Sequence, residues 1–164
     1  MNLLKTVLII LVVVILLACN NVEDCNYLKN RSIVLNFMVP SGKSYKDTLI
    51  NDIVIKTSQG KTIYDTASNL STNSIVVKQV TLPLSQNTDT SVFYFVFGNK
   101  AIDTISFFVE RSLELISTSC GFNTRFALDS IKSTKNIIQS IQIIDYNIGE
   151  DKEHDRNANI ILKK

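Results

Sequence analysis

The sequence predicts an all-β protein: an antiparallel β-sandwich, immunoglobulin-like or related, with about eight to nine strands and little helix. Three observations support this. Ile, Val, Thr, Ser and Asn dominate the chain after its first 18 residues. Apolar residues recur with a period of two, which is typical of strands, and helical periodicity is almost absent. Turn-forming residues interrupt the apolar runs at intervals of roughly ten residues.

The expected elements follow from this alternation. Ile33, Leu35 and Phe37 share one face of the first strand, and Pro83 restricts its own strand to an edge or a strand end. Residues 129–136 suit one short helical turn. The strand-like segments, some very short, are residues 32–39, 49–57, 62–64, 75–82, 91–97, 102–110, 113–116, 123–128, 137–148 and 159–162.

Two neighbouring segments predict a hairpin in the middle of a sheet. Residues 91–97 are apolar on both faces, so we expect a central strand that is covered on both sides. A turn that begins at Gly98 leads into residues 102–110, where Ile105 and Phe107 face inward. Residues 137–148 and 159–162 predict a second hairpin near the end of the chain.

The first 18 residues have the layout of an export signal. Lys5 precedes an apolar run of twelve residues, 7–18, which as a helix would span only about 18 Å and cannot cross a bilayer. The end of this run and the next residue, Leu16-Leu17-Ala18-Cys19, resemble a lipobox, which implies cleavage after Ala18 and lipid attachment to the Cys19 sulfur. An ordinary secretory signal with an incidental cysteine is the alternative. We therefore expect a signal peptide at 1–18, a lipidated tether at 19–30 and one β-sandwich domain at 31–164.

Without the signal, 16 Lys and Arg (17 minus Lys5) balance 15 Asp and Glu. This near-neutral charge argues against a nucleic acid partner, because phosphate binding needs a concentrated basic surface. Assigning Cys19 to lipid leaves Cys25 and Cys120, which we expect to form a disulfide in an oxidising compartment. Two buried free thiols are the alternative.

No pattern in the sequence indicates catalysis or a cofactor. His154 is the only histidine and lies in a charged loop, which is a poor scaffold for a triad or a zinc site. The same loop carries oxygen-bearing residues at alternate positions, which is a weak calcium pattern, but it departs from the EF-hand at Arg156 and Leu162. The calcium candidates are Asp151, Glu153, Asp155 and Asn157. Otherwise no metal ligands are predicted.

Two further patterns have competing interpretations. The aromatic residues of 93–97 and 107–108 could line a ligand cavity, but at strand spacing they are more typical of core. Four Asp-hydroxyl-apolar triplets are similar to an O-glycosylation sequon of exported Bacteroidota proteins, although Asp-Thr is also a common strand entry. Their hydroxyl residues are Thr48, Thr66, Thr104 and Ser130.

Several short motifs, in this order and spacing, resemble a family of small Bacteroidota lipoproteins known as a domain of unknown function (DUF6452-like). They are Cys19 followed by Cys25, Thr81-Leu82-Pro83-Leu84, Asp103-Thr104-Ile105, Ile116-Ser117 ahead of Cys120-Gly121, and Asn159-Ile160. The residues after Cys25 lack the proline-containing entry expected there. The resemblance implies a β-sandwich envelope lipoprotein and brings no catalytic residues.

We therefore expect a membrane-anchored, non-enzymatic structural or protein-interaction module. Its partners would be the lipid bilayer, through acylated Cys19, and another envelope protein. The alternative is a carrier or sensor of a small apolar or glycan ligand bound between or beside the sheets. The outer membrane is the expected location, on its periplasmic or surface face, and Glu23-Asp24 behind the lipidated cysteine favours surface display.

Overall fold

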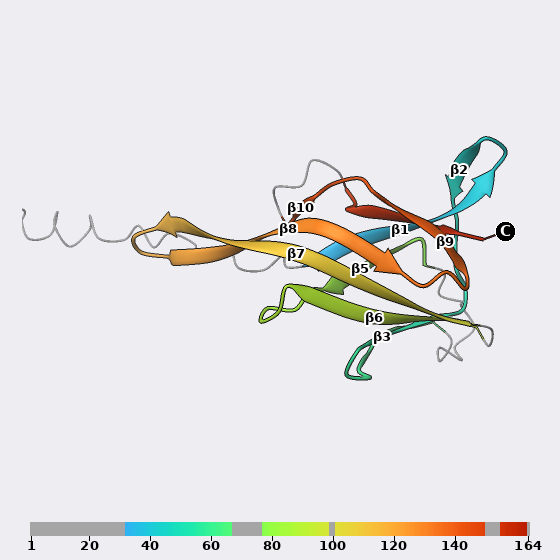
Figure 1. The fold of residues 1–164 in the computed structure, drawn as a ribbon, viewed down its shortest axis with the longest axis horizontal. Helices are drawn as coiled ribbons and strands as arrows, with labels where there is room; N and C mark the ends of the chain where they lie inside the picture. Colours follow the sequence, from blue (N-terminus) through green and yellow to red (C-terminus); the bar gives the residue numbers. More distant parts are fainter. Residues whose placement is uncertain (1–31, 67–76, 99–100, 150–154, 164) are drawn as a thin grey trace, which may run out of the picture.

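A computed structural model describes residues 32–66, 77–98, 101–149 and 155–163 (Figure 1). These residues form eleven strands and no helix, which confirms the all-β prediction and exceeds the expected number of strands. The strands are β1 (Ser32–Ser41), β2 (Ser44–Asp47), β3 (Ile53–Thr57), β4 (Thr62–Asp65), β5 (Gln79–Pro83), β6 (Thr90–Phe97), β7 (Ala101–Ser117), β8 (Gly121–Ser133), β9 (Ile138–Ile143), β10 (Asn147–Ile148) and β11 (Ala158–Leu162).

The smaller sheet has the strand order β2-β1-β11-β9, and β5 also pairs with β1. Pro83 ends β5, as its missing N–H predicts. The β1–β11 pair is parallel, with Leu35 beside Ala158 and Phe37 beside Ile160, whereas the other pairs in this sheet are antiparallel. This one parallel pair departs from the antiparallel arrangement that the sequence predicts and that the other pairs of this sheet follow. A parallel pair needs a long crossover, and here the rest of the domain provides it.

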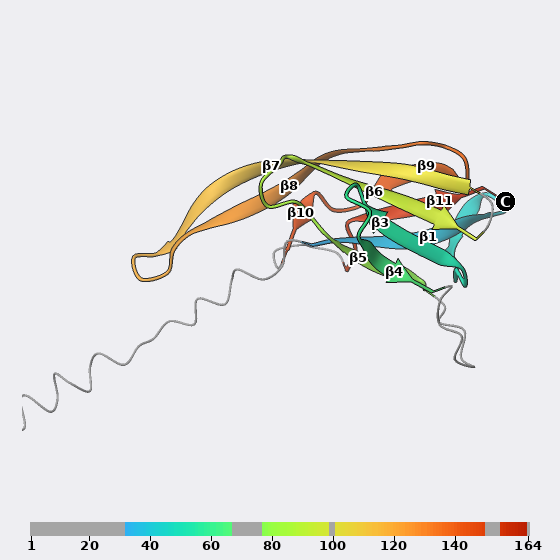
Figure 2. The same cartoon turned by 90° about the horizontal axis from the view of Figure 1, so that it is seen from below.

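The larger sheet is antiparallel throughout, with the order β10-β8-β7-β6-β3-β4, and it faces the smaller sheet (Figure 2). β6 occupies an interior position, as predicted, and its Phe93 and Phe95 are buried. The prediction that β6 is covered on both faces is wrong. Tyr94, on its other face, is 37% exposed, because that face of the sheet has no second layer over it.

The core lies between the two sheets, where the inward residues of every long strand meet. Phe93 and Phe107 pack edge to face with ring centroids 5.8 Å apart, and the rings of Phe95 and Phe97 stack. All four rings are buried, so the core interpretation of these aromatics is confirmed. Phe108 instead lies on the outer face, where the Lys132 ammonium sits 5.1 Å from its ring centroid.

The β7–β8 hairpin differs most from the sequence-based expectation. Residues 102–110 and 113–116 belong to one continuous strand, β7, whose register shifts at a bulge between Phe108 and Val109. β8 continues to Ser133, so the helical turn predicted for residues 129–136 is absent. Residues 130–133 form backbone hydrogen bonds with β7, and this strand pairing overrides their weak local preference for a helical turn.

The hairpin at the end of the chain is confirmed in part. β9 and β11 pair with each other, but residues 147–148 leave that sheet and pair with β8 as β10. The Asp145 Oδ1 accepts the Asn147 N–H at 2.9 Å, an Asx turn that bends the chain between the two sheets.

Two differences affect the first part of the chain. β3 begins only at Ile53, because Leu49 is 59% exposed and Ile50 makes just an isolated bridge to Val77. β2 was not predicted, since all four of its residues are exposed and it has no apolar alternation. It pairs with the end of β1 across a turn at Gly42, where φ is +65°.

Candidate functional site

A two-stranded arm projects from the body of the domain, and we define it as residues 111–125. Within the described residues, β6 pairs with β7 only as far as Phe108, and β10 pairs with β8 only at Phe126 and Ala127. Beyond these points β7 and β8 pair only with each other. The arm therefore extends away from the body and from the C-terminal end of the chain (Figure 1, Figure 2).

One face of the arm is apolar and exposed. Leu115 lies opposite Phe122, and Leu113 lies opposite Thr124, so the side chains form one continuous stripe. The exposed fractions are 74% for Leu113, 54% for Leu115 and 66% for Phe122. We call these three residues the apolar arm face. They continue, in register, the face that supplies buried core residues closer to the body.

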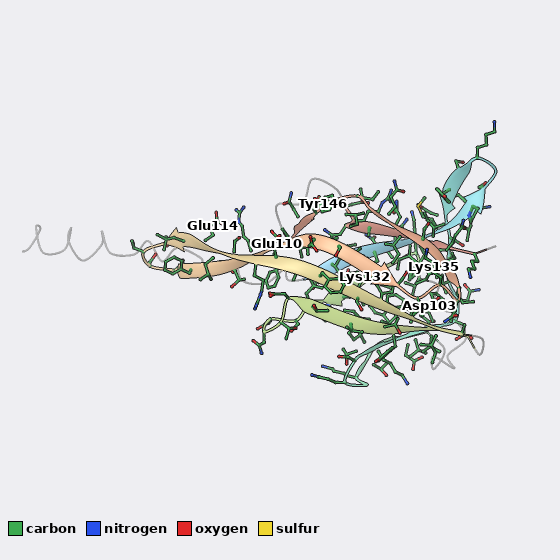
Figure 3. All side chains as sticks on the ribbon, in the orientation of Figure 1. Asp103, Glu110, Glu114, Lys132, Lys135 and Tyr146 are labelled. Atoms are coloured by element: carbon green, nitrogen blue, oxygen red, sulfur yellow. The ribbon has the colours of Figure 1, made fainter. Side chains whose placement is uncertain are left out.

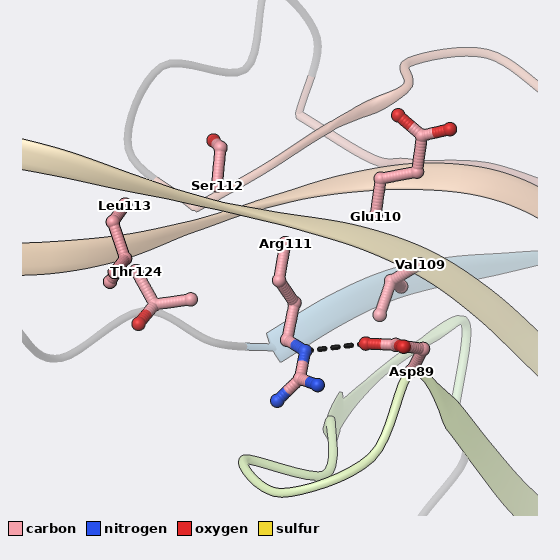
Figure 4. Close-up of a pocket in the computed structure, with 7 residues that line it drawn as sticks. All are labelled: Asp89, Val109, Glu110, Arg111, Ser112, Leu113 and Thr124. Carbon is pink, nitrogen blue, oxygen red and sulfur yellow. Dashed lines mark hydrogen bonds and ion pairs between the residues drawn. The ribbon is translucent and has the colours of Figure 1, made fainter.

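The opposite face of the arm is polar. Ser112 is paired with Arg125 and Glu114 with Asn123 in the strand register. The Glu114 carboxylate forms an ion pair with the Arg125 guanidinium. Glu114 is the only charged residue between positions 112 and 124. Arg111, at the root of the arm, lies on the same side of β7 as Leu113, so the charge-free part of the apolar face begins at Leu113 (Figure 4).

An open groove of about 640 Å³ lies at the root of the arm (Figure 4). The Arg111 guanidinium pairs with the Asp89 carboxylate and also donates to the Gln86 carbonyl at 3.1 Å. Glu110 points to the other side of β7 from this pair (Figure 4). The two carboxylates on the groove, Asp89 and Glu110, therefore do not converge on one point, as acid–base catalysis by a pair would require. The groove is lined by Asp89, Val109, Glu110, Arg111, Ser112, Leu113 and Thr124.

Comparison with known proteins gives the family. The sequence profile described as "Family of unknown function (DUF6452)" matches residues 53–161, which is more than half of the chain. The chain belongs to this family. In this DUF6452 member the matched segment runs from β3 into β11 and includes the whole arm and its groove. No curated protein and no solved structure matches the chain.

Asp103 accepts four hydrogen bonds in this DUF6452 protein, and its motif Asp103-Thr104-Ile105 did not predict these contacts. It lies in β7 at the opposite end of the body from the arm (Figure 3) and is fully buried. Oδ1 accepts the Thr134 hydroxyl and the Asn136 N–H, both at 2.7 Å. Oδ2 accepts the backbone N–H groups of Ile137 at 2.7 Å and Ile138 at 2.9 Å.

Burial by itself raises the pKa of Asp103, but these four hydrogen bonds lower it by more, so the net pKa lies below its usual value. Each oxygen already accepts two bonds, and all the donors belong to one loop. Asp103 therefore holds the β8–β9 connection in place, and we assign it a structural role.

A second polar cluster lies on the outer face of the smaller sheet. The Asp47 carboxylate pairs with the Lys78 ammonium and accepts the Asn36 amide at 2.9 Å; these two bonds lower the pKa of Asp47. Beside Asn36 in the register, Asn159 is buried and its Oδ1 has no hydrogen-bond partner. The cluster has only one carboxylate and offers no acid–base pair.

The predicted glycosylation sites differ in accessibility. Thr66 is buried, and its hydroxyl accepts the Ile53 N–H at 2.8 Å, so the folded domain does not present it for modification. Thr48, Thr104 and Ser130 are half-buried. In the triplet Asp103-Thr104-Ile105, the aspartate makes the hydrogen bonds described above. Its presence before Thr104 therefore has a structural explanation that does not need glycosylation.

Of the calcium candidates, Asp155 and Asn157 lie within the described residues. Asn157 is fully buried; its Oδ1 accepts the Val34 N–H at 2.9 Å and its amide donates to the Asn147 carbonyl at 2.6 Å. That oxygen therefore accepts a backbone hydrogen bond within the fold, and the calcium assignment stays a prediction. Asp155 is exposed, while Asp151, Glu153 and His154 lie outside the described residues. Among the residues described, no group of three or more His, Cys, Asp or Glu could hold a metal ion.

The cysteines are described only in part. Cys120 lies in the turn at the tip of the arm, where its N–H donates to the Ser117 hydroxyl at 3.1 Å. Cys19 and Cys25 lie outside the described residues, as does the expected signal segment, so lipidation and the disulfide stay predictions. In the described part of the chain, no helix is long and apolar enough to cross a membrane.

The sequence did not identify the arm as a candidate site. The sequence predicts two short strands here, residues 113–116 and 123–128, and the pattern does not say whether their apolar side chains are buried. The available signal was the combination of Leu113, Leu115 and Phe122 with an almost charge-free stretch around a turn. That combination also describes an ordinary core hairpin, and only the absence of strands beside it distinguishes the two.

Proposed function

We propose that this protein is a lipid-anchored protein of the bacterial cell envelope that acts by binding another envelope protein rather than by catalysis. The observation that carries the proposal is the open groove at the root of the projecting arm, which borders an exposed apolar side chain, Leu113. Exposed apolar patches rimmed by polar groups are typical of interaction sites. A two-stranded ribbon is also marginally stable by itself, so a contact along it would stabilise it.

The partner-binding surface in this proposal is the groove at the root of the arm. Val109 and Leu113 give it an apolar lining, and the Asp89–Arg111 pair gives it a polar rim. Five of the seven lining residues are polar or charged, so the groove suits a partner that offers charged and hydrogen-bonding groups beside one apolar contact at Leu113. The alternative of a carrier is less well supported, because buried phenylalanine rings occupy the space between the sheets. A small ligand would have to bind in the groove itself.

The anchoring part of the proposal rests on the sequence. The apolar run of residues 7–18 and Leu16-Leu17-Ala18-Cys19 support export, cleavage and acylation at Cys19. A Cys25–Cys120 disulfide would then join the tether to the tip of the arm. The Bacteroidota origin, the outer-membrane location and surface display, which Glu23-Asp24 favours, belong to the same proposal. Glycan attachment is proposed only for Thr48, Thr104 and Ser130.

Photo-crosslinking in intact cells tests the protein contact. A photoreactive phenylalanine analogue placed at Thr124, in the groove, should yield a discrete crosslinked protein. The matched control at Lys135 is exposed and lies at the far end of the body (Figure 3), so it should not give the same product. The proposal fails if both positions give the same products, or if position 124 gives none.

Lipidation and the disulfide have separate tests. Labelling of cells with radioactive palmitate should mark the wild-type chain and not the Cys19→Ala variant; labelling that persists in the variant contradicts the lipoprotein assignment. Mass spectrometry of a non-reduced digest should contain a peptide that links Cys25 to Cys120. Two unlinked thiols in freshly isolated protein would exclude the bridge.

A further inference from the structure

The apolar arm face needs an occupant that no described part of the chain supplies. Leu113, Leu115 and Phe122 lie on one side of a ribbon whose strands pair only with each other. The polar residues, including the Glu114–Arg125 ion pair, lie on the other side. Such a ribbon has the amphipathic pattern of elements that lie flat at a boundary between water and an apolar phase.

The position of Cys120 indicates which apolar phase this is. Cys120 lies in the turn at the arm tip, two residues before Phe122 in sequence. In the proposed function, Cys120 is bridged to Cys25, and Cys25 follows the acylated Cys19 by only six residues. Six extended residues reach at most about 20 Å. The turn would therefore be held beside the lipid headgroups, whereas the other end of the domain would not.

The chemistry of the tip agrees with this location. Between Ser112 and Thr124 the only charge is Glu114, and its ion pair is on the polar face. The apolar face can therefore enter an apolar environment without burying a charge, which would be costly. The turn itself carries hydroxyl groups at Ser117, Thr118 and Ser119, and these suit the hydrated headgroup layer.

We propose that the apolar arm face inserts into the interfacial layer of the lipid bilayer as a second attachment beside the acylated cysteine. This inference rests on the proposed lipid anchor and disulfide. It gives the domain a fixed orientation, with the arm tip on the membrane and β2 and the C-terminal end facing away from it (Figure 1). The groove at the root of the arm is then held just above the headgroups, where a membrane-associated partner is reached most easily.

Tryptophan fluorescence provides the test, because the chain contains no tryptophan. Phe122→Trp places a single reporter on the apolar arm face, and Leu115→Trp repeats the measurement at the paired position. Tyr45→Trp is the matched control: Tyr45 is also an exposed large side chain, and it lies in β2 at the opposite end of the domain (Figure 1). Each variant of the full, lipidated chain is reconstituted into phosphatidylethanolamine–phosphatidylglycerol vesicles with normal or brominated acyl chains.

At an insertion depth of about 5 to 10 Å, the emission of Phe122→Trp should shift to the blue and fall by about half in brominated vesicles. Leu115→Trp should behave in the same way, and Tyr45→Trp should emit as in water and stay unquenched. If the protein floats with the vesicles but Phe122→Trp and Leu115→Trp are unquenched, the insertion is refuted while the lipid anchor stands. Equal quenching at Tyr45→Trp also refutes it. If the protein does not float with the vesicles, the anchor fails and the insertion fails with it.

Discussion

Replacing Asp103 by asparagine removes half of the acceptor capacity of its side chain. Asp103 accepts four hydrogen bonds from the loop before β9, two at each oxygen. The amide of Asn keeps one oxygen, but its NH₂ group would face two donors in place of an acceptor. Because the site is fully buried, water cannot substitute for the lost contacts.

The size of the effect follows from those bonds. A hydrogen bond to a charged group contributes about 1.5 to 3 kcal/mol, so the loss of two bonds should lower the free energy of unfolding by about 3 to 6 kcal/mol. This is a large part of the 5 to 15 kcal/mol that is usual for a domain. Thr134→Val removes one donor to Asp103 and also the acceptor of the Thr104 N–H, which is at an exposed position where water can replace it. It should cost about 1 to 2 kcal/mol and serves as a milder variant if Asp103→Asn folds poorly.

The effect should also depend on pH. The pKa of folded Asp103 lies below its ordinary value of 3.8. The stabilisation is therefore fully present above the unfolded pKa and is lost as the pH falls through the folded pKa. The difference in stability between wild type and Asp103→Asn should be constant near neutral pH and should shrink below about pH 4.

Urea denaturation of the detergent-solubilised full chain, followed by far-ultraviolet circular dichroism, measures the change in the free energy of unfolding and its dependence on pH. Asp129→Asn is the control, because Asp129 is exposed on β8 and, within the described residues, accepts a hydrogen bond from the hydroxyl of its neighbour Ser130. It should change stability by less than about 0.5 kcal/mol. A cost below about 1 kcal/mol for Asp103→Asn at neutral pH, or an equal cost at acidic pH, would refute the structural role assigned to this carboxylate.

Three further changes test the fold in the same assay. Gly98→Ala places a Cβ 3.1 Å from the Asp52 carboxylate at a φ of +55° and should lower the free energy of unfolding by about 1 to 3 kcal/mol. Gly42→Ala, which has a similar φ and nothing within 4 Å of the new Cβ, should have a smaller effect. Equal effects of the two substitutions would exclude the Asp52 contact as the cause. Asn157→Asp replaces the amide donor to β10 with a buried carboxylate and should cost at least about 2 kcal/mol, whereas a neutral result would show that the site admits water. Phe107→Ala empties the centre of the core and should cost about 3 to 5 kcal/mol, and a cost near 1 kcal/mol would mean that the sheets collapse around the gap.

The sequence shows the apolar residues of the arm but does not show that they form an exposed surface. Leu113 and Leu115 lie in the strand predicted at residues 113–116, whereas Phe122 lies just outside the next predicted strand, residues 123–128. Whether such positions are core or surface depends on what packs over them. That is decided by β6 and β10, which stop pairing at Phe108 and Phe126 and leave the arm uncovered.

The sequence by itself determined the fold class and the inward face of most strands, because side chains alternate across a strand with a period of two regardless of its neighbours. Ile33, Leu35, Phe37, Ile105 and Phe107 face the core for this local reason. Only the tertiary structure decided which strands pair. The parallel contact of β1 with β11 and the capture of a distant loop by Asp103 join residues that lie far apart in the chain, so no short segment encodes them. The same holds for the arm, whose exposure depends on where strands elsewhere in the chain end.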